Sequence, residues 1–157
     1  MNTICESIER ILTEGKHSFH SDGQGHIVLT SRIKSGYVRL HVQVNEVQRR
    51  IGVIGSTGFR VPDRCMGMVL AQLNRFNAKS SFATAYLDPE DGELMASYGI
   101  LVDDMSVNDD SVLFSLQVVL NALSELHMPV LQTAVSWGIC DSPEQDLPDE
   151  PAEQDAP

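Results

Sequence analysis

The sequence is poor in the residues that mark secreted and membrane-spanning proteins. Its 157 residues include three cysteines, Cys5, Cys65 and Cys140. An odd and sparse set of this kind indicates free thiols in a reducing compartment and argues against a disulfide framework. No continuous apolar run approaches the ~18 residues that cross a bilayer, and no signal peptide is recognisable at the N-terminus. We therefore expect a cytoplasmic protein with no membrane-spanning segment.

Basic residues are missing from the second half of the chain. Residues 1–79 hold 11 basic and 6 acidic side chains (+5), whereas residues 80–157 hold no basic and 16 acidic side chains (−16). The whole chain has a net charge of −11 and a pI of about 4.7. Because phosphate backbones require an extended basic surface, we expect no nucleic-acid partner.

The last 19 residues differ in composition from the rest of the chain. Residues 139–157 contain seven acidic residues, four prolines and only two bulky apolar side chains. Such a segment cannot bury enough apolar area to offset the entropy lost on ordering. The composition predicts one domain over residues 1–138 and a disordered acidic, proline-rich tail over 139–157. The tail either keeps the protein soluble or contacts the basic half of its own domain or a partner.

Hydrophobic periodicity predicts an α+β fold. Apolar residues at helical spacing indicate helices at 3–14, at 63–78 and from Ser106 onward, and alternating or apolar runs indicate strands at 26–33, 37–46, 50–55, 81–88 and 93–102. The order is α-β-β-β-α-β-β-α. Short turns between successive strands predict one antiparallel sheet with helices packed mainly on one face. Pro129 is expected to interrupt the last helix, which then continues to Trp137.

Two segments carry residues that also occur in ligand-binding loops. The glycine-rich run 52–58 precedes a helix, and with Arg60 it has the composition of a phosphate cradle. It lacks the P-loop and dinucleotide-binding spacings, so we interpret it as a strand with a bulge. Residues 88–93 carry several carboxylates but lack the spacing of a calcium loop. Asp91-Gly92 within this segment predicts a hairpin turn.

Neither histidine nor cysteine forms a recognisable catalytic or metal-binding pattern. His17 and His20 are three residues apart and would point to opposite faces of a strand, and His41 falls on a hydrated face. Cys65 begins a predicted helix, where the dipole lowers a thiol pKa, but no motif pairs it with a base. We interpret Cys65 as a buried structural residue. We predict no metal site, no cofactor, no catalytic residues and no enzymatic activity.

A combination of short motifs runs from Val61-Pro62 through Leu73-Asn74-Arg75-Phe76-Asn77 to the Asp91-Gly92-Glu93-Leu94 turn, and Ser106 then leads a long apolar helix. In these features residues 1–137 resemble the YbjN-like family, whose fold is similar to that of type III secretion chaperones. The resemblance implies a sensory-transduction or stress-linked regulator without an established enzymatic activity. The related chaperones are small acidic homodimers that bind extended segments of client proteins. Asn74 and Asn77 are the polar positions of this pattern, and local helix capping or bonding to the following loop accounts for both.

Two hypotheses for function follow. The first is a non-enzymatic protein-interaction module, a chaperone-like or regulatory adaptor that binds a segment of an unidentified, acidic partner protein. Its predicted partner-binding residues lie on the hydrated sheet face and the adjoining turn: Arg32, Arg39, His41, Gln43, Arg49 and Arg50. The alternative is a small-ligand sensor or an enzyme that uses a cavity between helices and sheet, with lining residues drawn from Phe82, Tyr86, Met95 and Tyr98. Analogy with chaperone dimers predicts a homodimer that contacts through Met66, Met68 and Leu70.

Overall fold

The computed structural model describes residues 3–103 and 107–137. Its elements are α1 (Ile4–Glu14), β1 (Phe19–Ser21), β2 (His26–Ile33), β3 (Gly36–Asn45), β4 (Arg50–Arg60), a 3-10 turn η1 (Asp63–Cys65), α2 (Met66–Lys79), β5 (Thr84–Leu87), β6 (Glu93–Leu101) and α3 (Asp109–Ser136). All strand pairs are antiparallel, and the sheet order is β1-β2-β3-β4-β6-β5. The predicted fold class and antiparallel sheet are confirmed. One strand, β1, was not predicted, because its three residues are too few to show an alternating pattern.

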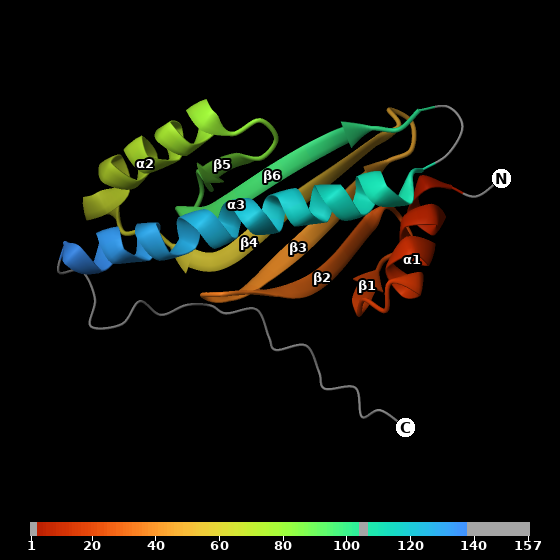
Figure 1. Cartoon of the computed structure of the whole chain (residues 1–157), viewed down its shortest axis with the longest axis horizontal. Coiled ribbons are helices and arrows are strands. Elements are labelled where there is room, and N and C mark those ends of the chain that lie inside the picture. Colours follow the sequence, from red (N-terminus) through yellow and green to blue (C-terminus); the bar gives the residue numbers. More distant parts are fainter. Residues whose placement is uncertain (1–2, 104–106, 138–157) are drawn as a thin grey trace, which may run out of the picture.

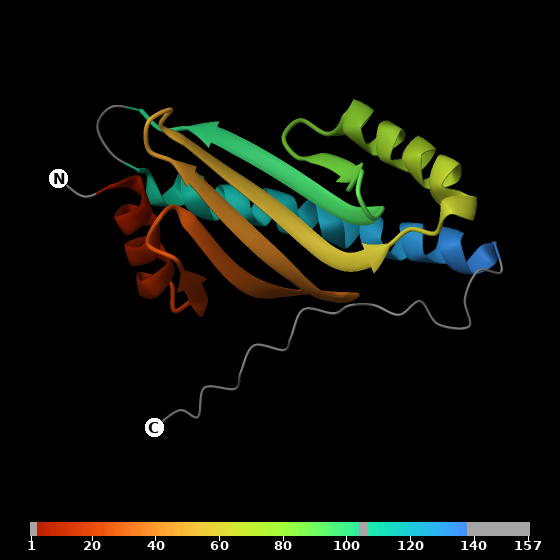
Figure 2. The ribbon, with the colours of Figure 1, turned by 180° about the vertical axis from the view of Figure 1, so that it is seen from behind.

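The helices are gathered on one side of the sheet. Figure 1 shows α3 lying across the strands, with α1 near the β1 edge and α2 near the β5 edge. Figure 2 shows the opposite face from behind, where no helix of the described chain covers β2, β3, β4 or β6. We call this uncovered surface the open face. The predicted one-sided packing is therefore confirmed.

The core lies between the sheet and α3. Every second side chain of β3 and β4 is buried, as alternation requires when one face packs and the other is hydrated. Gly55 of β4 lies directly under α3, and a Cβ built there would come within 2.6 Å of both Val119 and Leu123. The missing side chain therefore lets the helix pack closely on the strand.

The last helix, α3, differs from its prediction in two respects, at its first residues and at Pro129. Its N-cap is Asn108, whose side chain accepts a hydrogen bond from Ser111 N; Ser106 lies outside the described residues. Pro129 does not interrupt the helix, which is continuous to Ser136. Pro129 provides no N–H for the carbonyl of Glu125, and both residues are exposed to solvent. The buried side chains on either side of the proline, Leu126 and Val130, hold both halves on the core.

By length and composition alone, α3 would be long and apolar enough to cross a bilayer. The criterion of a continuous apolar run missed this helix, because serine, glutamine and asparagine divide it into short apolar runs. The position of α3 across the sheet accounts for its composition. Ten of its side chains are buried in the domain: Val112, Ser115, Leu116, Val119, Ala122, Leu123, Leu126, His127, Val130 and Ala134.

Two side chains, one in α2 and one at its C-cap, bond backbone groups at the β5 edge of the sheet. Alternation directs the N–H and C=O of Ala85 away from β6, because Asp88 N bonds Glu93 O and every second pair is then hydrogen-bonded. The carboxamide of Asn77 receives Ala85 N–H and donates to Ala85 O, both at 2.9 Å. Ser80 Oγ donates to Ala83 O at 2.7 Å. These bonds occupy backbone groups that would otherwise pair with another strand.

We predict that Asn77→Ala lowers the free energy of unfolding by about 1–3 kcal/mol, because both backbone groups of Ala85 lose their partner. Urea denaturation followed by circular dichroism measures the change. Asn74→Ala is the matched control. Asn74 lies on the same helix and is exposed, so its loss should change stability by less than about 0.5 kcal/mol. Equal effects of the two substitutions would contradict the role assigned to Asn77.

We also predict opposite effects for two glycines of β4. Gly55→Ala should destabilise the domain by about 1–3 kcal/mol, because the new methyl group overlaps Val119 and Leu123. A Cβ at Gly52 meets nothing within 4 Å, so Gly52→Ala should be neutral or raise stability by about 0.5 kcal/mol. Thermal unfolding of both variants checks this. A Gly55→Ala protein as stable as the native one would show that the helix does not rest on the strand at this point.

Candidate functional site

The open face is built from rows of side chains that the strand register places next to one another. Arg39 lies between Thr30 and Ser56, and His41 lies between Val28 and Ile54. The register thus brings the β3 residues of the predicted partner-binding set into one stripe, and each faces a side chain of β2 or β4. The rows are as follows: Arg32 and Tyr37; Thr30, Arg39, Ser56, Met95 and Tyr86; His20, Val28, His41, Ile54, Ser97 and Thr84; His26, Gln43, Gly52 and Gly99; Asn45, Arg50 and Leu101.

Three arginines give the open face its charge. Arg32, Arg39 and Arg50 are exposed, and within the described residues none of them forms an ion pair. An acidic side chain of β6, Glu93, accepts hydrogen bonds from Ser56 Oγ and from Gly58 N. Glu93 therefore bonds groups of β4, and it forms no ion pair with the three arginines. The face presents unneutralised positive charge around half-buried apolar side chains, such as Ile54.

A shallow hollow interrupts the open face near one end. Gly52 and Gly99 are directly opposite each other on β4 and β6, so neither strand places a side chain there. The hollow has a volume of about 330 Å³, and its lining residues are Gln43, Val44, Asn45, Gln48, Arg50, Ile51, Gly52 and Gly99. We call it the Gly52–Gly99 hollow. Two predicted residues, Gln43 and Arg50, thus border a depression that the sequence pattern did not predict.

The open face also carries a histidine pair that the sequence pattern missed. His26 Nε2 lies 3.2 Å from His41 Nδ1, and the rings stack with centroids 5.4 Å apart. Burial, followed by the charges of His26 and Arg39, lowers the pKa of His41 below its ordinary value. Only the β2–β3 register brings these residues together, since 15 positions separate them in the chain. Within the described residues, no group of three or more His, Cys, Asp or Glu is placed to hold a metal ion.

Arg49 has a structural contact that the sequence pattern did not suggest. It occupies the turn before β4 with a φ of +50°. Its guanidinium donates to Val102 O at 3.3 Å and to Asp103 O. It therefore binds the segment that leaves β6, and it differs in this respect from the other predicted partner-binding residues.

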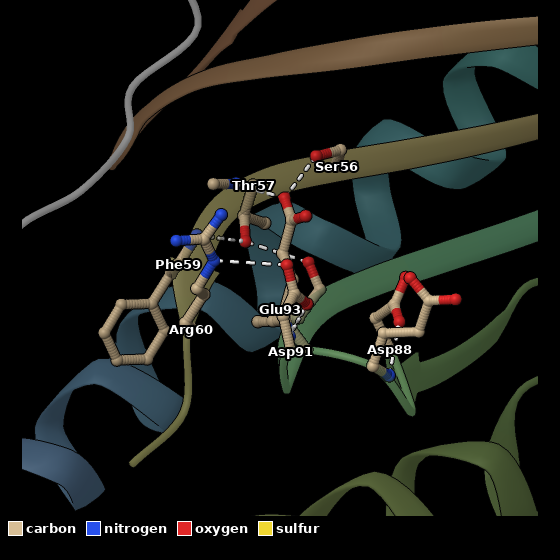
Figure 3. Close-up of polar contacts among 10 residues, drawn as sticks. Ser56, Thr57, Phe59, Arg60, Asp88, Asp91 and Glu93 are labelled. Carbon is tan, nitrogen blue, oxygen red and sulfur yellow. Dashed lines mark hydrogen bonds and ion pairs between the residues drawn. The ribbon is translucent and has the colours of Figure 1, made fainter.

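The glycine-rich run forms a bulge at the end of β4, as predicted, and Figure 3 shows how it is held. Gly58 has a φ of +72° and donates its N–H to Glu93 at 2.7 Å. Thr57 Oγ1 donates to Leu94 O and accepts from Phe59 N. Arg60 pairs with Asp91 at 3.1 Å. Because a carboxylate of the chain already occupies the Gly58 N–H, this loop does not form the phosphate cradle considered from its composition.

The acidic segment after β5 is a hairpin turn, as predicted. Gly92 N donates to Asp88 O at 2.8 Å, and Gly92 has a φ of +75°. Asp88 and Asp91 each accept a hydrogen bond from a backbone N–H two residues later, which is the ordinary role of aspartate in a turn. These bonds account for the carboxylates without a calcium ion.

The described cysteines are buried and do not have the properties of reactive thiols. Cys5 and Cys65 are both free and buried, and burial raises the pKa of each thiol above its ordinary value. The interpretation of Cys65 as a structural residue fits this environment, since a nucleophilic thiol needs a lowered pKa. Cys140 lies outside the described residues.

The residues of the alternative hypothesis, a cavity between helices and sheet, are divided between the two faces. Tyr86 and Met95 are paired on the open face. Tyr98 lies on the helix side and forms edge contacts with Phe82 and Phe114, whose centroids lie 6.0 and 6.2 Å from its own. Beside this aromatic cluster is a cleft of about 290 Å³, lined by Phe76, Lys79, Ser80, Phe82, Ala83, Val118, Asn121, Ala122 and Glu125. The four residues therefore do not line one common cavity.

The predicted dimer-contact residues lie on α2. Met68 and Leu70 are about half exposed, and Met66 is partly buried. Met66 and Leu70 are one turn apart and share a side of the helix, whereas Met68 points to the other side. The structure thus brings together two of the three residues. The homodimer stays a prediction.

Residues 5–128 match the YbjN family, which is described as "Putative bacterial sensory transduction regulator". The chain belongs to the YbjN family. It is similar in structure to YbjN from E. coli, with 17% sequence identity, a TM-score of 0.62, and coverage of 80% of this chain and 92% of that one. No curated protein matches the chain.

Two further solved structures have a similar fold. The chain is similar to one in the HopA1–SchA chaperone–effector complex, with 13% identity, a TM-score of 0.55, and coverage of 78% of this chain and 91% of that chain. It is also similar to one in the ExsC–ExsE complex, with 17% identity, a TM-score of 0.55, and coverage of 80% and 96%. At these identities the likeness establishes the fold, and the resemblance to type III secretion chaperones in fold is confirmed.

We predict that His26→Gln raises the pKa of His41, because the positive charge of His26 is one of the causes that lower it. An NMR titration of the imidazole signals measures the shift. His20→Gln is the control, since His20 lies on the same face but on the far side of Val28. An unchanged pKa of His41 in the His26→Gln protein would show that the pair does not interact in solution.

Proposed function

We propose that this protein is a non-enzymatic interaction module, a chaperone-like or regulatory adaptor that binds an extended acidic segment of a partner protein on its open face. The observation that carries the proposal is the set of Arg32, Arg39 and Arg50, which surround an uncovered sheet surface without carboxylate partners among the described residues. Family membership supports a regulatory role. The HopA1–SchA structure, a chaperone–effector complex, supports a protein partner.

The shape of the molecule favours binding on the face over strand addition at an edge. At β5, Asn77 already bonds the outward N–H and C=O of Ala85, and Ser80 bonds Ala83 O just before the strand. At the other edge, β1 is only three residues long and provides few backbone groups for a new strand. The open face, in contrast, extends over the four neighbouring strands β2, β3, β4 and β6 and combines arginines with half-buried apolar side chains. Mixed surfaces of this kind suit protein partners.

The spacing of the arginines favours an extended partner segment. Arg32 lies in the row of Tyr37, and Arg50 lies in the row of Asn45. The length of β3 between those rows is eight residues, or about 26 Å at 3.3 Å per residue. A peptide of about eight residues in an extended conformation covers this distance, and carboxylates along it reach both ends of the stripe. A compact small ligand would reach only one end.

Two accompanying properties belong to the same proposal. The protein acts in the cytoplasm, where its cysteines stay reduced. It acts as a homodimer that contacts through α2, where Leu70 exposes apolar surface beside Met66, away from the open face. Light scattering at micromolar concentration tests the dimer, and a mass of 17.3 kDa would reject it.

The test is affinity capture from native lysate at low salt with the full-length protein and two variants of equal charge change. Arg39→Glu reverses a charge in the middle of the open face. Arg75→Glu reverses one on α2, where Arg75 is exposed and lies outside the open face. We expect a protein that the native chain and Arg75→Glu both retain and that Arg39→Glu loses by at least tenfold, as expected for a charge pair worth about 1.4 kcal/mol.

The captured protein is then identified and its acidic segment synthesised. Fluorescence anisotropy with this peptide should reproduce the loss on Arg39→Glu and show weaker binding as salt increases. Two results would overturn the proposal: capture of no protein by the native chain, or equal retention by Arg39→Glu and Arg75→Glu. The second would place the binding surface elsewhere, with the aromatic cluster beside the α2–α3 cleft as the next candidate.

A further inference from the structure

We propose that the acidic segment 139–157 of this same chain docks on the open face and competes there with the partner. This inference rests on the proposed function, because both ligands use the same arginines. It adds a regulatory contact that the fold comparison does not provide. Three independent properties of the chain support it: charge, reach and the chemistry of proline.

Charge complementarity is the first argument. Segment 139–157 contains seven acidic residues and no basic residue. The open face presents Arg32, Arg39 and Arg50 with no carboxylate partner within the described residues. Other acidic groups near the sheet are already engaged: Glu93 accepts from Gly58 N, and Glu46 accepts from the first N–H groups of α1. The charge of the segment is therefore opposite in sign to that of the open face.

Reach is the second argument. His127 of α3 lies 2.7 Å from the hydroxyl of Ser35, in the β2–β3 turn, so α3 passes the end of the sheet where Arg32 lies, and its last turns continue past the sheet (Figure 1). The ten residues from His127 to Trp137 extend about 15 Å beyond that point. The 19 residues of the segment span about 59 Å at 3.1 Å per residue. That length covers the return, the passage around the sheet and the ~26 Å of the arginine stripe.

The prolines are the third argument, and they select the face over an edge. Pro143, Pro148 and Pro151 have no backbone N–H, so this segment is a poor added strand. Proline does favour an extended chain, and such a chain holds its carboxylates apart. The segment therefore matches a surface that is read by side chains and has arginines at both ends.

A segment of the same chain that occupies the open face lowers the apparent affinity for the partner. A segment tethered by a short linker has an effective concentration of about 1 mM. If its intrinsic dissociation constant is about 0.1 mM, the partner binds about tenfold more weakly than it would to an empty face. Because both contacts are ionic, added salt should weaken the competition as well as the binding.

The experiment compares the native chain with a full-length variant in which all seven acidic residues of the segment are changed, Asp→Asn and Glu→Gln. Amide NMR spectra are recorded at about 20 mM and about 500 mM salt. We expect the amides of Arg39, His41, Gly52 and Gly99 to differ between the two proteins at low salt and to coincide at high salt. The amides around Arg75 on α2 should not differ under either condition.

A synthetic peptide of residues 139–157 is then added to the neutralised variant. It should shift the same open-face amides, and Gly52→Val in that variant should weaken its binding at least threefold by filling the Gly52–Gly99 hollow. A Cβ at Gly52 meets no atom within 4 Å, so this substitution tests the surface without disturbing the core. Spectra that coincide at low salt, or peptide shifts confined to other surfaces, would overturn the docking.

The two proposals fail separately. If the native and neutralised chains give the same spectra while partner capture still depends on Arg39, the tail contact is wrong and the proposed function stands. If the tail shifts the open face while the native chain and the neutralised variant both retain no partner, the proposed function is wrong. If both hold, the neutralised variant should bind the partner peptide about tenfold more tightly than the native chain, as anisotropy measures directly.

Discussion

The packing of α3 on one face of the sheet is the interaction on which the rest of the structure depends. The helix buries ten side chains, and Gly55 allows it to approach β4 closely. A single layer of helices stabilises one face of an antiparallel sheet and leaves the other hydrated. The core and the open face are thus two results of the same alternation in β2, β3, β4 and β6. Any function of the open face requires that this one-sided packing be stable.

A sheet with an uncovered face must still avoid pairing with other sheets through its edges. Here the carboxamide of Asn77 occupies the outward N–H and C=O of Ala85 in β5, and the hydroxyl of Ser80 occupies Ala83 O just before the strand. The chain therefore limits strand addition at β5, while its broad surface stays accessible. Bonded groups at the β5 edge and an accessible open face together favour binding through side chains. The recognition elements are the arginines and the Gly52–Gly99 hollow.

The reactive groups of the described chain are committed to structure. Burial raises the pKa of Cys5 and Cys65, and Glu93, Asp88 and Asp91 bond the backbone of the bulge and the turn. On the open face, Arg32, Arg39 and Arg50 form no ion pair within the described residues. In physical terms, the molecule has an accessible surface for a partner, and we propose that the acidic segment 139–157 competes for that surface.

The sequence by itself determined the elements and their faces. Alternation in residues 37–46 and helical spacing in α1 and α3 are local patterns, so they predicted the α+β class, the one-sided sheet, and the placement of Arg39, His41 and Gln43 on the face away from the core. Only the tertiary structure decided which distant residues meet. The His26–His41 pair, the Gly52–Gly99 hollow and the contact of Asn77 with Ala85 each depend on strand register or helix placement. The continuity of α3 through Pro129 also depends on packing. The contacts of both halves with the sheet stabilise the helix by more than the missing hydrogen bond destabilises it.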